Sequence, residues 1–127
     1  MIPSDLRAAQ KAEEDLIREV ARQGYSEAAI FAIKLAVEEA LNNAIRHGNA
    51  GDPNRKVSFS YHVRPDRAAI TVSDEGHGFD PDDLPDPTAD ENLEKPCGRG
   101  IMLIRAYMDE VRFNPRGNQV HMIKHNR

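Results

Sequence analysis

The chain has 127 residues, of which 30% are charged and 39% are hydrophobic, so we expect one soluble domain with a single core. Lys and Arg total 17 against 21 Asp and Glu, and the formal charge of -4 argues against nucleic acid or an acidic membrane as the main partner. The single cysteine, Cys97, excludes an internal disulfide, and no apolar run reaches the roughly 18 residues of a membrane span. Because the start MIPSDLRAAQ also lacks the regions of a signal peptide, we predict a cytoplasmic protein.

The first part of the chain predicts two helices. Ser4 can cap a helix from about Asp5 to Gln23, and Gly24 ends it. Ser26 can cap a second helix that continues to Gly48. The apolar side of the first helix comprises Leu6, Ala9, Leu16, Ile17 and Val20. The apolar stripe of the second helix, which should pack on a sheet, comprises Ile30, Ile33, Val37, Ala40, Leu41 and Ala44.

The alternation of apolar and polar residues that is typical of half-buried strands recurs in four segments: residues 57–63, 68–72, 111–113 and 120–122. RPDR joins the first two segments and NPRGN joins the last two, so both pairs are predicted to be hairpins. GRGIMLIRAYM predicts a short buried helix between the hairpins. Because the strands come in hairpins, we predict the α+β class: a two-layer sandwich with helices on one face of a mainly antiparallel sheet.

The second predicted helix holds Glu39 and Asn43 four residues apart, within VEEALNNAIRHGN. Together with Arg46 they fall in a narrow arc roughly opposite the apolar stripe, so one interpretation is a solvated helix face. The other interpretation is a binding site, because Asn is a poor interior helix residue and the small Ala32 and Ala36 continue the line as if leaving room. A carboxylate and an amide one turn apart can address an attacking hydroxyl and a hydrated cation, which favours phosphoryl transfer.

The turn DEGHG, residues 74–78, directly follows a predicted strand. Its glycines allow positive φ and the close approach of a flat ligand to the backbone. At the end of the strand, Asp74 could accept a hydrogen bond from an exocyclic amino group such as that of adenine. An ordinary turn is the alternative interpretation, because turns also require Asp and Gly.

The Pro-rich and acidic segment Phe79–Pro96 shows no helical or strand period. Loops of this length inside a compact domain are usually either functional lids or disordered. After it, CGRGIML places Gly98, Arg99 and Gly100 at a helix N-terminus, where free N–H groups and the helix dipole favour a phosphate. The alternative is a glycine-capped helix start with a solvated arginine. The chain contains neither a Walker P-loop nor a G-x-G-x-x-G motif.

Taken in order, E-x-x-x-N-A followed by H-G, D-x-G-x-G, a variable lid and G-x-G opening a helix resemble the Bergerat-fold (GHKL) ATP-binding superfamily. That group holds DNA gyrase, the mismatch-repair ATPases, sensor histidine kinases and the anti-sigma-factor serine kinases. The resemblance covers residues 1–127 as a single ATPase domain, with a lid at about residues 79–97. EEALNNAIRHG and GRGIMLIRAYMDEV are most similar to the small bacterial anti-sigma-factor serine/threonine kinases. The best-known members begin with an additional strand, for which MIPSD is short.

The resemblance implies a role for each motif residue. Asn43 would coordinate the Mg²⁺ that bridges the phosphates of ATP, and Glu39 would be the general base. Asp74 would bind the adenine amino group, while Gly76 and Gly78 would let the base lie against the backbone. The residues that would contact the phosphates from the lid and the following helix start are Lys95, Gly98, Arg99 and Gly100.

The identity of residue 39 distinguishes branches of the superfamily. Sensor histidine kinases commonly carry Asn there, whereas a serine or threonine hydroxyl benefits from a carboxylate such as Glu39. The resemblance therefore implies a serine/threonine kinase that inhibits a sigma factor and phosphorylates its antagonist, typically a STAS-domain protein. It also implies a homodimer formed through the sheet. Two alternatives remain: a non-catalytic ATP-binding module that sequesters a partner, and the catalytic fragment of a histidine kinase.

Overall fold

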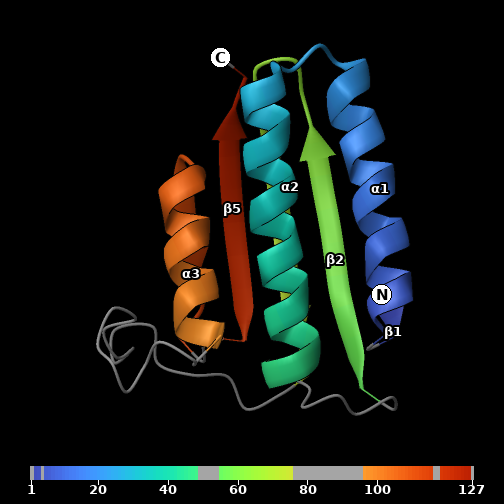
Figure 1. Ribbon diagram of the computed structural model, residues 1–127, viewed down its shortest axis with the longest axis vertical. Helices are drawn as coiled ribbons and strands as arrows, with labels where there is room; N and C mark the ends of the chain where they lie inside the picture. The colour runs from blue at the N-terminus through green and yellow to red at the C-terminus, as the bar shows by residue number, and fades with distance from the viewer. Residues whose placement is uncertain (1, 4, 49–54, 76–95, 116–117, 127) are drawn as a thin grey trace.

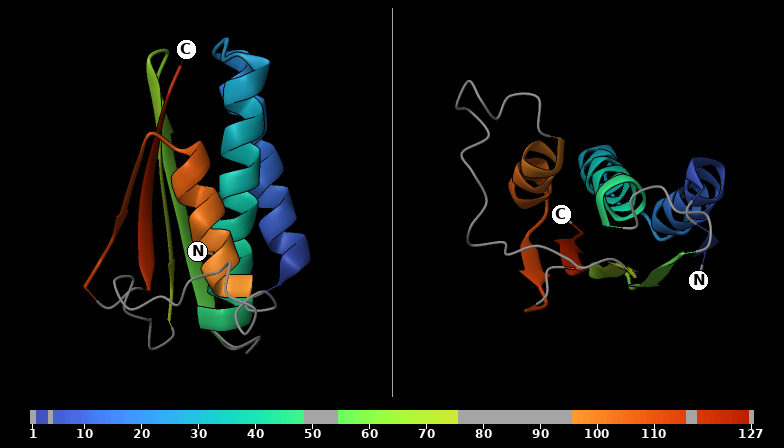
Figure 2. Two further views of the ribbon diagram at one scale, coloured as in Figure 1. Left: turned by 60° about the vertical axis from the view of Figure 1, so that its left-hand side comes forward. Right: turned by 90° about the horizontal axis from the view of Figure 1, so that it is seen from below.

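The structure is a computed structural model that describes residues 2–3, 5–48, 55–75, 96–115 and 118–126. In chain order its elements are β1 (Ile2–Pro3), α1 (Leu6–Arg22), α2 (Glu27–Asn42), the π-helical turn η1 (Asn43–Gly48), β2 (Lys56–Val63), β3 (Arg67–Asp74), α3 (Pro96–Tyr107), β4 (Glu110–Phe113) and β5 (Gln119–His125). The helices lie side by side over one face of the sheet (Figures 1 and 2). The predicted α+β sandwich is confirmed.

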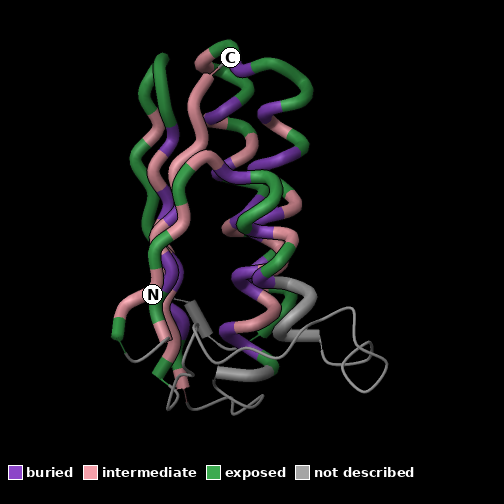
Figure 3. Tube along the Cα trace, turned by 90° about the vertical axis from the view of Figure 1, so that its left-hand side faces the viewer, coloured by how far each residue is buried: buried purple, intermediate pink, exposed green. Residues whose placement is uncertain are grey.

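Among the described residues, the sheet has five strands in the order β1-β2-β3-β5-β4, and every neighbouring pair is antiparallel. Both predicted hairpins are therefore confirmed. In β3 the alternation is clear, because Ala68, Ile70 and Val72 are buried toward the helices while the intervening residues are half-buried. The register pairs Ile70 with Met122 of β5, which is also buried. Buried residues recur along both layers in Figure 3, so the core lies between sheet and helices.

The N-terminal residues form an additional strand despite their small number. Ile2 pairs with Val57, and Pro3 pairs with Lys56, at the outer edge of β2. From the length of MIPSD we expect too few residues for such a strand. The strand forms nevertheless, but it has two residues. A strand of this length gains its order from β2 rather than from its own sequence, so local propensity could not predict it.

The start of α1 differs from the predicted one by a residue. Asp5, rather than Ser4, is the N-cap: its backbone is extended, and its side-chain oxygen accepts a hydrogen bond from the Arg7 N–H at 2.9 Å. Ser4 lies outside the described residues. On the predicted apolar side, Leu6 is 42% exposed, whereas Ala9 is buried.

The second helix starts as predicted, with the Ser26 hydroxyl accepting a hydrogen bond from the Ala29 N–H at 3.1 Å. It differs from the prediction at two points. Its last turn, η1, is π-helical rather than α-helical. Ala32 and Ala36 are also buried rather than open to a ligand, and Ala36 belongs to the core cluster that includes Ile104 of α3. Helix α2 also packs against α3.

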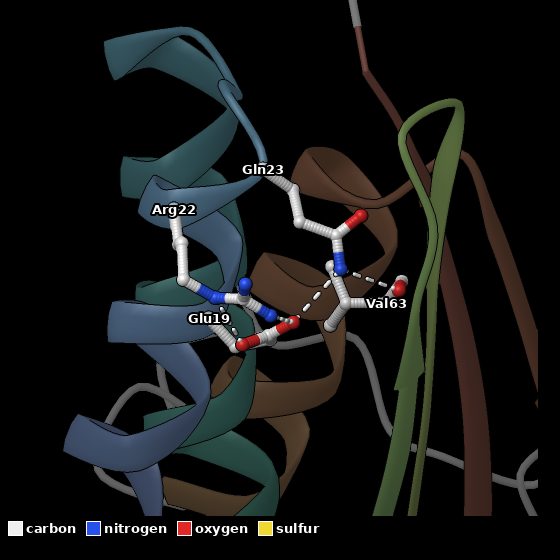
Figure 4. Close-up of polar contacts among 4 residues, drawn as sticks. All are labelled: Glu19, Arg22, Gln23 and Val63. Carbon is white, nitrogen blue, oxygen red and sulfur yellow. Dashed lines mark hydrogen bonds and ion pairs between the residues drawn. The ribbon is translucent and has the colours of Figure 1, made fainter.

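Side-chain hydrogen bonds connect the end of α1 to the sheet (Figure 4). The Gln23 amide nitrogen donates to the Val63 carbonyl at 2.7 Å and to the Glu19 carboxylate at 2.8 Å. Arg22 donates to the same carboxylate, and this hydrogen bond lowers the pKa of Glu19. Nearby, the Tyr25 hydroxyl donates to the Arg64 carbonyl at 2.6 Å. These bonds fix the far end of the helix layer, opposite the end where η1 lies.

Candidate functional site

Three elements that carry the predicted motifs meet at one end of the sandwich, the lower end in Figure 1. There α2 passes into η1, β3 ends at Asp74, and α3 begins at Pro96. Both β3 and α3 contact η1. Segments that are far apart in the sequence thus bring the ends that hold the motif residues to one place, as a binding site requires.

Glu39 and Asn43 lie on the same side of the helix at this end. The Asn43 N–H donates to the carbonyl oxygens of Glu39 and Ala40, and Asn43 has α-helical dihedrals (φ -62, ψ -43). The two residues are therefore one α-helical turn apart, and the π-helical geometry begins only at Asn43. Both are half-buried, whereas Arg46 is exposed. A fully solvated helix face does not describe this pair.

Asp74 is the last residue of β3 and continues the inward-facing row of that strand. It pairs with Val57, which is completely buried, and is itself half-buried. Glu75 follows it, and the Glu75 carboxylate accepts a hydrogen bond from the Lys56 N–H at 2.5 Å. The strand end therefore directs the Asp74 carboxylate toward the helix layer, on the side where β3 contacts η1.

The other predicted site residues are described only in part. Gly98, Arg99 and Gly100 lie in α3, so the predicted helix is confirmed, although it begins at Pro96 rather than at Gly98. Gly76, Gly78, Lys95 and residues 79–95 of the predicted lid lie outside the described residues. The structure thus brings together the positions of Glu39, Asn43 and Asp74, and the roles of all these residues stay predictions.

Sequence reasoning missed Asn118, which lies between β4 and β5. The side-chain amide of Asn118 donates to the backbone carbonyl of Asp74 at 3.1 Å. The backbone carbonyl of Asn118 accepts a hydrogen bond from the Asp74 N–H at 2.9 Å. The signal was present in NPRGN, because Asn side chains in turns commonly bond to nearby backbone. The sequence alone could not predict that Asn118 would bond to Asp74 of β3.

A second polar feature lies between α1 and α2. Glu13 is only 6% exposed, and its Oε1 atom has no hydrogen-bond partner among the described residues. Burial, followed by the neighbouring carboxylate of Glu38, raises the pKa of Glu13 to about 7, while Lys34 acts in the opposite direction. Glu13 also lines a groove of about 390 Å³ between the two helices, together with Lys34 and Arg18.

Residues 2–124 match the histidine kinase-like ATPase domain family. The chain belongs to this family. The predicted resemblance is confirmed, and members of the family are ATPase domains by name. In the part of the chain that the structure describes, no helix is both long and apolar enough to cross a membrane.

Two similar proteins carry the name of a particular kind of kinase. Serine-protein kinase RsbW of Bacillus subtilis is 40% identical over 113 residues, which cover 82% of this chain and 69% of RsbW. RsbW of Listeria innocua is 31% identical over 111 residues, covering 82% of this chain and 71% of the relative. The chain is thus similar to proteins named as serine-protein kinases.

Two solved structures share the fold. The RsbU and RsbW domains of a Mycobacterium tuberculosis protein match with a TM-score of 0.61 at 19% identity, covering 99% of this chain and 30% of that one. The mycobacterial sensor histidine kinase MprB matches with a TM-score of 0.55 at 17% identity, covering 77% of this chain and 72% of that one. At these identities the match concerns the fold alone.

Proposed function

We propose that this chain is an ATP-dependent serine/threonine protein kinase of the anti-sigma-factor type. The observation that carries the proposal is the pair Glu39 and Asn43, half-buried and one α-helical turn apart, at the end of the sandwich where β3 delivers Asp74. The similarity to RsbW kinases over most of the chain supports the same assignment.

The residues at this end fit a magnesium nucleotide by their chemistry. Asp74 offers a carboxylate acceptor for the adenine amino group at the inner face of the sheet. Among the described residues, no group of three or more His, Cys, Asp and Glu side chains could hold a metal ion by itself. Mg²⁺ usually takes one or two protein oxygens and completes its shell with water and substrate phosphates. The Asn43 amide oxygen is the proposed protein ligand, and bound Mg²⁺ would neutralise phosphate charge.

Glu39 is the proposed general base. It accepts the proton of the attacking hydroxyl while the hydroxyl oxygen bonds to the γ-phosphorus and the bond to the β-phosphate oxygen breaks, with ADP leaving. The half-buried position of Glu39 supports this role, because partial exclusion of water strengthens the interaction of a carboxylate with a nearby hydroxyl.

The proposed partners are a sigma factor, which the chain would bind and inhibit, and a STAS-domain antagonist, which it would phosphorylate on serine or threonine. The proposal further includes a homodimer formed through the sheet, Gly76 and Gly78 beside the adenine, and phosphate contacts from Lys95, Gly98, Arg99 and Gly100. The similarity to a protein named as a serine-protein kinase supports phosphate transfer to a serine hydroxyl.

The direct test incubates the purified chain with γ-labelled ATP and STAS-domain proteins from the same organism. We expect acid-stable phosphate on one of them, and a loss of about 100-fold or more in the rate for Glu39→Gln with ATP affinity retained. Glu27→Gln, which removes an exposed carboxylate at the other end of α2, is the matched control and should transfer phosphate normally. An undiminished rate for Glu39→Gln would refute Glu39 as base. Acid-labile phosphate would instead indicate a histidine acceptor.

A further inference from the structure

The connection between β4 and β5 holds the end of β3 by two hydrogen bonds. Regular pairing of β3 with β5 ends at Ser73 and Gln119. Beyond this pair, the N–H of Asp74, the last residue of β3, donates to the backbone carbonyl of Asn118, the residue before β5, at 2.9 Å. The Asn118 side-chain amide donates to the Asp74 carbonyl at 3.1 Å. Both backbone polar groups of Asp74 are thus bonded to a single residue.

Asn114 fixes the side chain of Asn118 in this arrangement. The Asn114 amide nitrogen donates to the Asn118 Oδ1 atom at 2.7 Å, and the Asn114 Oδ1 atom accepts from the Asn118 N–H at 3.1 Å. Because the Oδ1 atom of Asn118 is engaged by Asn114, its amide nitrogen is directed at Asp74. The same Asn114 oxygen also accepts from the Gln119 N–H at 3.2 Å.

We propose that Asn118 is a positioning residue for Asp74: by bonding both backbone groups of Asp74, it sets the direction of the carboxylate that selects adenine. The inference rests on the proposed nucleotide site and adds to it the residue that orders the strand end. A terminal strand residue frays readily, and a carboxylate used for recognition must be held to within about 0.5 Å by its supporting shell. Asn118 provides that support from another hairpin.

The test distinguishes an effect on the orientation of the Asp74 carboxylate from a general effect on the stability of the fold. Binding is measured for ATP and for purine riboside triphosphate, which has hydrogen in place of the adenine amino group. Loss of the Asp74 direction weakens only the bond to the amino group. We therefore expect Asn118→Ala to lower the preference for ATP over the analogue by about 5-fold, the value of one hydrogen bond, with affinity for the analogue unchanged.

Asn126→Ala is the matched control. The Asn126 amide donates to the Pro65 carbonyl at 2.7 Å at the opposite end of the sheet, so it removes the same kind of bond away from Asp74. It should keep the preference of the wild type. Asn114→Ala, which frees the Asn118 side chain without removing it, should give a smaller decrease than Asn118→Ala and serves if the latter does not fold.

Equal weakening of both nucleotides, or an unchanged preference, in Asn118→Ala would overturn the inference. If Asp74→Asn abolishes the preference while Asn118→Ala retains it, the nucleotide site stands and only the positioning role fails. If the wild type binds neither nucleotide, the proposed function fails, and the inference fails with it.

Discussion

At the scale of single residues, the least expected group is the buried carboxyl of Glu13. Its pKa of about 7 in the folded chain lies above the usual value of 4.5, chiefly because burial disfavours its charged form. A folded pKa above the unfolded one means that the protonated group stabilises the fold at low pH. This contribution is complete below about pH 4.5 and is lost as the pH rises through 7.

Glu13→Gln should therefore stabilise the protein at pH 8 and have little effect at pH 4.5, because glutamine mimics the neutral carboxyl at both pH values. The expected gain at pH 8 is on the order of 2 kcal/mol in the free energy of unfolding. Urea denaturation at the two pH values measures it. Glu14→Gln removes the same charge from an exposed position of α1 and should show no comparable gain. Equal effects of Glu13→Gln at both pH values would contradict the assigned pKa.

Some of these residues could be placed from the sequence alone, and others could not. Glu39 and Asn43 could be placed on one helix face, because their spacing is local and the helical period is fixed. Asp74 could be placed at a strand end for the same reason. The bond between Asn118 and Asp74 joins residues that are 44 positions apart, so it depends on the pairing of β3 with β5. The burial of Glu13 depends in the same way on the packing of α1 against α2.

At the scale of elements, the turn between α1 and α2 contains a glycine with positive φ, Gly24, and a helix N-cap, Ser26. Gly24 has a φ of 81, a conformation that suits glycine, and an added Cβ would meet nothing within 4 Å among the described residues. Gly24→Ala should therefore cost about 1 kcal/mol through backbone strain alone. Thermal or urea unfolding measures the loss, and Ala28→Gly, at an exposed position of the following helix, gives the reference for a helical glycine. A Gly24→Ala variant as stable as the wild type would contradict the strain.

The Ser26 cap makes a separate prediction. Ser26→Ala removes the acceptor of the Ala29 N–H and should lower the free energy of unfolding by about 1 kcal/mol. Ser60→Ala changes an exposed serine in β2 and should leave the stability nearly unchanged. If the two variants are equally stable, the cap contributes nothing measurable.

Elements with local signals were predictable, and those that depend on tertiary contacts were not. The Ser26 cap and both hairpins follow from neighbouring residues. The strand β1 exists through its pairing with β2, and the burial of Ala32 and Ala36 depends on their tertiary environment. The space that these alanines leave on a helical wheel is therefore no sign of a ligand.

At the scale of the whole molecule, the sandwich places the ends of α2, β3 and α3 together, and this arrangement gives the proposed metal ligand a testable role. Chelation of Mg²⁺ should weaken ATP binding by the wild type, because Asn43 would hold the metal and the metal would neutralise phosphate charge. Asn43→Ala should lose most of this dependence, whereas Asn42→Ala, at the neighbouring half-buried position, should retain it. Calorimetric titration with and without EDTA decides it, and full Mg²⁺ dependence in Asn43→Ala would refute the role of Asn43.

This end of the sandwich is proposed to be an adenine nucleotide site with Asp74 as its selective acceptor. Calorimetric titration of the wild type and Asp74→Asn with ATP, ADP and GTP in the presence of Mg²⁺ tests it most directly. We predict that the wild type binds both adenine nucleotides and rejects GTP, and that Asp74→Asn loses adenine binding while remaining folded. Absence of ATP binding by the wild type would refute the nucleotide site, and ATP binding unchanged in Asp74→Asn would refute Asp74 as the adenine acceptor.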